Sequence, residues 1–222
     1  MFKDKQMKFL SIDFETANDS LMSACAIGSV YFEETKPEST NHSLIKPPVF
    51  HRKLKEENFN IHNIDYKTYS KGKNFKKVWS ELTTQIPEIN HEDTVFVCFN
   101  AIFDVSVLMN LLKKYKISKN FIFVDPMQVA KQIWVDRESY SLKNLCNDLE
   151  IELDHHNPLS DAKAAGILLT KQLQITKKES LSSLLNEYGL NFIKTDYEKN
   201  GFYDHYGDFK KTALNFQDIK KK

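Results

Sequence analysis

The chain has 222 residues, of which 41% are hydrophobic and 27% charged, and its formal net charge is +1. This composition is ordinary for a soluble α/β domain, and the near-neutral charge excludes a global attraction to nucleic acid. No apolar run approaches the ~18 residues of a membrane span, so we expect neither a span nor a signal peptide. Three widely spaced cysteines predict buried free thiols in a reducing cytoplasm: Cys25, Cys98 and Cys146.

The first half of the chain predicts three strands and then a helix. Short polar connections between the strands favour an antiparallel meander. The polar stretch 49–77 predicts a loop-rich excursion with short helical turns. Apolar residues at helical spacing over 75–86 then predict a helix that Pro87 ends. The three expected strands cover residues 8–16, 24–32 and 42–45.

The second half predicts strand–helix units. A continuous apolar run at 94–99 is typical of a strand buried on both faces, and it leads into a helix. A second unit begins with a strand at 121–124. Further helices are expected over residues 127–134, 141–151 and 158–175. A meander followed by such units predicts an α/β fold with a central, mixed, five-stranded sheet and helices on both faces.

Residues 1–175 form the expected domain, and residues 176–222 form a C-terminal helical and aromatic appendage that is not an independent domain. One amphipathic helix is expected around residues 181–185, before Gly189. The aromatic and lysine residues that follow would guide single-stranded nucleic acid or pack on the body or a second subunit. Packing is the alternative that we expect.

Two carboxylates interrupt the first strand. Asp13 and Glu15 leave the same face of that strand, about 7 Å apart along the backbone. Like charges on a buried strand repel each other and resist desolvation, so they need a cation, and a divalent metal is the obvious candidate. Taken alone, such a pair is more often an exposed strand end with solvated acids.

Two further acids lie at helix starts. Asp104 follows a buried strand, and Asp161 opens the last long helix, five residues after His156. Such positions can converge on one edge of an α/β sheet, where ligands bind. Either acid singly could instead be stabilised by the helix dipole. His156 could be a loop residue without a role, or His155 could be the histidine that matters. Their joint order and spacing favour one site.

Three segments together resemble the exonuclease motifs of the DEDDh 3′–5′ exonucleases, which are related to the epsilon proofreading subunit of bacterial DNA polymerase III. These segments are residues 11–16, 99–104 and 156–162, and lesser matches lie at 61–64, 125–126 and 141–145. The resemblance covers about residues 7–175 and implies a three-layer, ribonuclease H-like fold.

The resemblance also implies roles. Two Mg²⁺ or Mn²⁺ ions would be held by four carboxylates: Asp13, Glu15, Asp104 and Asp161. His156 would be the general base, because the family's histidine precedes its last aspartate by five positions. His156 has this spacing to Asp161, and His155 does not. Phe99 departs from the histidine that many relatives carry there, which leaves the metal site intact.

Five further residues are expected to bind substrate: Phe14, Thr16, Asn100, Phe103 and His62. Phe14 would offer a stacking surface to the terminal nucleotide, although a core position is as common for a strand phenylalanine. Thr16 would lie near the 3′ end. For His62, a structural role in its loop is favoured over contact with substrate.

The implied function is metal-dependent removal of nucleoside 5′-monophosphates from single-stranded 3′ ends. DNA is favoured, because the motifs are closest to the polymerase-associated branch, and RNA trimming is the alternative. An alternative of another class is a non-catalytic nucleic-acid-binding or polymerase-partner protein, against which the complete set of acids argues. The expected partner is a single-stranded 3′ end, with a DNA polymerase or a second copy of the chain as candidates.

Overall fold

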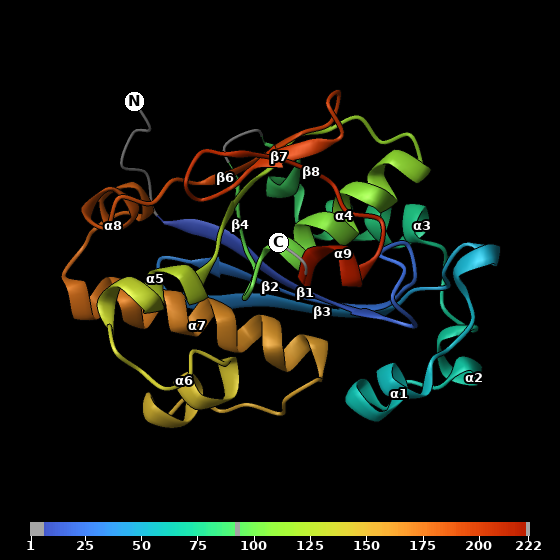
Figure 1. The fold of residues 1–222 in the computed structure, drawn as a ribbon, viewed down its shortest axis with the longest axis horizontal. Coiled ribbons are helices and arrows are strands. Elements are labelled where there is room, and N and C mark those ends of the chain that lie inside the picture. Colours follow the sequence, from blue (N-terminus) through green and yellow to red (C-terminus); the bar gives the residue numbers. More distant parts are fainter. Residues whose placement is uncertain (1–6, 92–93, 221–222) are drawn as a thin grey trace.

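The computed structural model describes residues 7–91 and 94–220. Within them, one mixed eight-stranded sheet has the order β3-β2-β1-β4-β5-β6-β7-β8 (Figure 1). Its strands are β1 (Lys8–Thr16), β2 (Ala24–Glu33), β3 (Lys36–Leu44), β4 (Val95–Val97), β5 (Ile122–Val124), β6 (Ile193–Asp196), β7 (Gly201–Tyr203) and β8 (Phe209–Lys211). The predicted mixed sheet is confirmed, whereas the predicted count of five strands is wrong.

The three additional strands come from the C-terminal segment. β6 pairs antiparallel with β5, and β7 and β8 continue the sheet outward. Ile193 and Phe202 of this segment belong to the same buried core as Leu10 of β1. Strands of three or four residues give almost no alternating pattern, so their pairing with a distant strand decides the structure here.

The predicted meander is present. β1 is antiparallel to β2 along its whole length, from Lys8 opposite Glu33 to Thr16 opposite Ala24. β3 continues the meander beside β2 and begins earlier than expected, at Lys36. Its first half is exposed and polar, so only its backbone pairing reveals it as a strand.

Helices cover both faces of this sheet. The helical segments are η1 (Val49–His51), α1 (Glu56–His62), α2 (Tyr66–Tyr69), α3 (Phe75–Gln85), η2 (Pro87–Asn90), α4 (Ile102–Lys114), α5 (Pro126–Ile133), α6 (Leu142–Asp148), α7 (Pro158–Thr176), α8 (Leu181–Glu187) and α9 (Phe216–Lys220). α7 runs along one face with α5 and α6 beside it, while α3 and α4 pack on the other face (Figure 1). The molecule therefore has three layers, as a ribonuclease H-like fold requires. Across residues 7–91 and 94–220, every helix falls short of the length or apolar character needed to cross a bilayer.

Candidate active site

The two acids of β1 face α7. Ile12 and Phe14 enter the core beneath α3 and α4, so the alternation of the strand directs Asp13 and Glu15 to the opposite face. That face is the one on which α7 packs. The β1 sequence thus pairs a buried apolar face with an acidic one.

α7 brings the third acid to this face. Its first turn contains Asp161, which is 5% exposed. Carboxylate oxygens of Asp13, Glu15 and Asp161 lie within 4.8 Å of one another. Gly28, which pairs with Asp13 across the β1–β2 ladder, permits this approach, because a Cβ there would lie 2.1 Å from the carbonyl oxygen of Pro158.

Asp104 approaches from α4 and braces β1. Its Oδ1 accepts a hydrogen bond of 2.9 Å from the backbone N–H of Phe14, the residue between the two β1 acids. Asp104 is 1% exposed. Among the described residues, the group of acids whose ligand atoms lie within 4.8 Å does not include Asp104. The backbone N–H of Phe14 thus fixes this carboxylate beside β1.

These carboxylates are buried close together and repel one another. Burial raises the pKa of Asp13 well above its usual value, and repulsion from Asp104, Glu15 and Asp161 raises it further. Burial, followed by repulsion from Asp161 and Asp104, raises the pKa of Glu15 to about 8. Burial likewise raises the pKa of Asp104 against the hydrogen bond from Phe14. Within the described part of the chain, no lysine or arginine forms an ion pair with any of the four acids. Such a cluster needs bound cations or protons.

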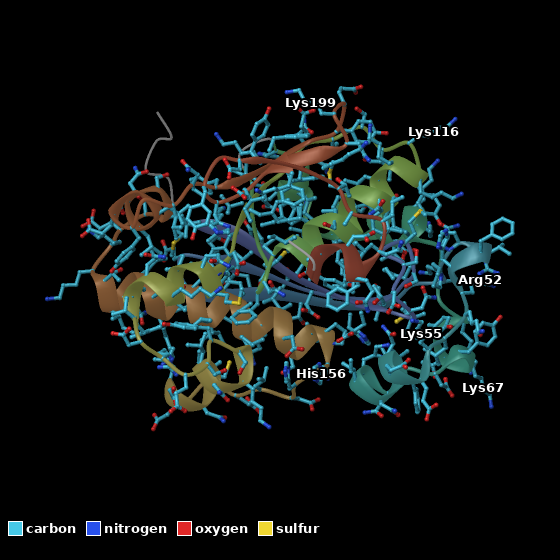
Figure 2. All side chains as sticks on the ribbon, viewed as in Figure 1. Arg52, Lys55, Lys67, Lys116, His156 and Lys199 are labelled. Atoms are coloured by element: carbon cyan, nitrogen blue, oxygen red, sulfur yellow. The ribbon has the colours of Figure 1, made fainter. Side chains whose placement is uncertain are left out.

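Two adjacent histidines complete the acidic cluster. His155 Nδ1 lies 3.1 Å from Asp161 Oδ1, whereas the backbone N–H of His156 donates to Asp161 Oδ2 over 2.9 Å. The two imidazole rings stack with centroids 3.8 Å apart. Burial and the neighbouring His155 lower the pKa of His156, so its ring is neutral and able to accept a proton near pH 7. Figure 2 shows His156 just before α7 begins.

Asp13, Glu15 and Asp161 line a cleft of about 650 Å³ together with His155 and His156, whereas Asp104 is not among its lining residues. Asn100 and Phe103, predicted to bind substrate, line it as expected from their place beside Asp104. Polar side chains that sequence reasoning did not identify also line it: Lys131, Glu138, Ser139 and Tyr140. Ser141, which begins the lesser match at 141–145, lines it beside them. They belong to α5 and to the connection between α5 and α6. In this segment the sequence predicted only where a helix begins.

Asp125 holds the Asn100 turn in place. Its carboxylate accepts from the backbone N–H groups of Asn100, Ala101 and Met127, each at 2.9–3.0 Å. Burial raises the pKa of Asp125 to about 6 against these bonds. Asn100 has a φ of 58°, a left-handed conformation that this anchoring maintains. The lesser match at 125–126 therefore contains a residue, Asp125, that supports the wall of the cleft.

The other three residues predicted to bind substrate are packed into the protein. Phe14 borders the cleft, but its side chain is 2% exposed and lies in the core. Thr16 is 6% exposed and lies outside the residues that line the cleft. His62 Nε2 lies 3.1 Å from the carbonyl oxygen of Thr16, and its Nδ1 accepts from the N–H of Ile64. The structure therefore gives His62 hydrogen bonds that support the end of β1.

An acid-lined cleft at one edge of a ribonuclease H-like sheet defines a domain of the nuclease type. The chain belongs to the exonuclease family, since the family described as Exonuclease (RNase_T) matches residues 10–169. It is 29% identical over 91 residues to DNA polymerase III PolC-type of Caldanaerobacter subterraneus subsp. tengcongensis. That match covers 40% of this chain and 6% of the relative, so the chain spans only a small part of the relative's length.

Solved structures share the fold. The nuclease domain of 3'hExo, a DEDDh family member bound to rAMP, superposes with a TM-score of 0.66 at 15% identity, over 77% of this chain and 94% of that one. Exonuclease X in complex with 5′ overhanging duplex DNA gives 0.61 at 20% identity, over 79% and 98%. Pop2p of S. pombe, in its Mg²⁺- and Mn²⁺-bound form, gives 0.62 at 14% identity, over 79% and 86%.

Proposed function

We propose that the chain is a metal-dependent 3′–5′ exonuclease that removes nucleoside 5′-monophosphates from single-stranded ends, with DNA as its substrate. The observation that carries this proposal is the convergence of Asp13, Glu15 and Asp161 with two histidines in one cleft of an exonuclease-family domain. Asp104 joins them from the opposite side of β1.

Two divalent cations fit the donors of this site. Among the described residues, the clustered ligand atoms are carboxylate oxygens and imidazole nitrogens, which suits Mg²⁺ or Mn²⁺. Burial and mutual repulsion raise the pKa values of Asp13 and Glu15, so bound cations would stabilise the ionised acids. Asp13, Glu15 and Asp161 would hold the cations together with Asp104. When bound, such cations neutralise the negative charge of the phosphodiester, lower the pKa of a bound water and stabilise the departing 3′ oxygen.

His156 is the proposed general base. Its neutral ring lies on the cleft and can take the proton of the attacking water. His155 positions the site by its contact with Asp161 and by stacking on His156. Asn100 and Phe103 would flank the terminal nucleotide, while Phe14 borders the cleft and His62 supports the end of β1 at Thr16.

DNA is the preferred substrate because the similar PolC-type relatives are DNA polymerases III and because exonuclease X was solved with DNA. RNA trimming is the second candidate, supported by the rAMP bound to the nuclease domain of 3'hExo. A DNA polymerase is a candidate partner, because the similar PolC-type relatives are DNA polymerases III. The proposed location is the cytoplasm, because the three buried cysteines are free thiols, as is typical of a reducing compartment.

Mononucleotide release tests this proposal. Purified protein is incubated with single-stranded DNA or RNA of matched sequence, with Mg²⁺, Mn²⁺ or EDTA, and products are separated by chromatography. We expect nucleoside 5′-monophosphates, faster from DNA, and none in EDTA. Faster release from RNA would select the trimming alternative. Binding of either polymer without any release would instead identify a non-catalytic binding protein.

A further inference from the structure

An exposed aromatic and basic surface lies outside the active-site cleft. Phe50 is 96% exposed and Val49 67% exposed. They border a hollow of about 370 Å³ together with Arg52 and Lys114. We call this region, residues 48–52 with 114 and 115, the outer surface. Among the described residues, neither Arg52 nor Lys114 forms an ion pair, and no carboxylate lines the hollow.

The backbone that carries Phe50 is held firmly. His51 Nδ1 lies 2.7 Å from Ser20 Oγ, and the His51 carbonyl accepts from Asn18 Nδ2 over 3.1 Å. The hydroxyl of Tyr69 donates to the carbonyl of Arg52 over 2.6 Å. An apolar ring is therefore displayed to solvent on an ordered support, at low entropic cost for a ligand.

The outer surface lies at the same end of the sheet as the active site. β1 runs toward this end through Asp13 and Glu15, and β3 ends there shortly before η1. Asn18, which bonds η1, follows Glu15 by three residues. In the view of Figure 2, Lys55 lies between the labelled Arg52 and His156. A strand that leaves the cleft toward η1 would meet this surface.

We propose that the outer surface binds the single strand several nucleotides upstream of the 3′ end held in the cleft. The face of Phe50 stacks a base, while Arg52 and Lys114 contact phosphates, a combination typical of sequence-tolerant binding to single strands. Charge argues for this occupant, because Arg52 and Lys114 line the hollow beside the ring and none of its described lining residues is acidic. The Nε of Arg52 donates to the carbonyl oxygen of Pro47 over 2.6 Å, which holds the guanidinium in place. The inference rests on the proposed function. It implies that the affinity of the enzyme for its substrate increases with the length of the strand.

Variants of the outer surface test this inference. Phe50→Ala and Lys114→Gln are compared on DNA of three and of 20 nucleotides, and on the p-nitrophenyl ester of thymidine 5′-monophosphate. We expect KM for the long strand to rise about tenfold in Phe50→Ala, and less in Lys114→Gln, with the two small substrates unaffected. The controls are Tyr206→Ala, at a side chain 61% exposed, and Lys36→Gln, at the opposite end of the sheet.

Equal kinetics of variant and wild type on the long strand would overturn the inference. An equal loss on all three substrates would also overturn it, because the change would then act through the cleft. If the wild type released nothing from any substrate, the proposed function would fail. Anisotropy of a labelled 20-nucleotide strand in EDTA then decides alone: about tenfold weaker binding by Phe50→Ala supports the outer surface, and unchanged binding rejects it.

Discussion

Gly28 and Pro158 touch so closely that a Cβ on the glycine would lie 2.1 Å from the proline carbonyl oxygen. Because Gly28 pairs with Asp13, this contact sets how near the start of α7, with Asp161, comes to the acids of β1. The backbone of the helix start cannot yield as a flexible side chain would. The distance between the acids is therefore decided partly by a residue that carries no chemistry.

Gly28→Ala is predicted to displace the start of α7 and to lower kcat by about 10- to 100-fold, because misplaced groups lose much of their effect. The measurement is exonuclease kinetics with Mg²⁺, together with thermal unfolding. Ser29→Ala, at the next position of β2, is the matched control and should resemble the wild type. Full activity of Gly28→Ala would show that α7 tolerates the shift and would contradict this role.

Asp104 is predicted to combine two separable roles. Asp104→Asn keeps an oxygen to accept from the Phe14 N–H but removes the charge, so folding should persist while activity falls about 100-fold or more. Asp104→Ala removes the acceptor as well and should lower the free energy of unfolding by about 1–3 kcal/mol. Urea unfolding and kinetics of both variants separate the roles. Equal stability of the two variants would contradict the bracing role.

The stability of the metal-free protein is predicted to fall between about pH 4.5 and pH 8. The pKa of Glu15 is raised from 4.5 to about 8, chiefly by burial, so the folded state holds its proton more tightly than the unfolded state. Ionisation above the unfolded pKa then destabilises the folded protein, on the order of 1–3 kcal/mol. Asp13 acts in the same direction.

Thermal unfolding in EDTA across this pH range measures the slope. Glu15→Gln should flatten it, whereas Glu179→Gln, at an exposed position, should not. Mg²⁺ at millimolar concentration should restore stability at pH 8. A metal-free protein that is more stable at pH 8 than at pH 5 would be inconsistent with clustered, buried acids.

The two histidines are predicted to differ in their effects. His156→Ala should lower kcat by about 10²- to 10⁴-fold, the usual contribution of a general base. It should also abolish the acid limb of the pH–rate profile, which in the wild type falls below a pKa lowered from 6.5. His155→Ala should lower kcat less and keep that limb, since its ring acts through Asp161. The reverse pattern would assign the base to His155.

Sequence reasoning found the parts of the fold that are locally encoded. An apolar run in which Asp13 and Glu15 occupy one face predicts β1. Pro158 and a long apolar stripe predict α7. β6, β7 and β8 were not predicted because each has only three or four residues. β6 pairs with β5, some 70 residues earlier, and β7 and β8 extend the sheet from β6. The first half of β3 shows no alternation because its residues are polar and exposed.

The site divides in the same way. The identity of the acids follows from local sequence, but their contacts do not. The imidazole of His155 meets Asp161 because His156 adopts a φ of 70°, which turns the chain between them. No residue type at 156 dictates that conformation. The bond from Phe14 to Asp104 joins residues 90 positions apart and is equally invisible before folding.

The direction of digestion tests the central claim most directly. Single-stranded DNA labelled at its 5′ end, and a second sample labelled at its 3′ end, are digested with Mg²⁺ by the wild type, Asp13→Asn and His156→Ala. The account predicts a ladder shortening one nucleotide at a time from the 3′ end, immediate release of the 3′ label, and strong loss in both variants. Immediate release of the 5′ label, or undiminished digestion by Asp13→Asn, would contradict it.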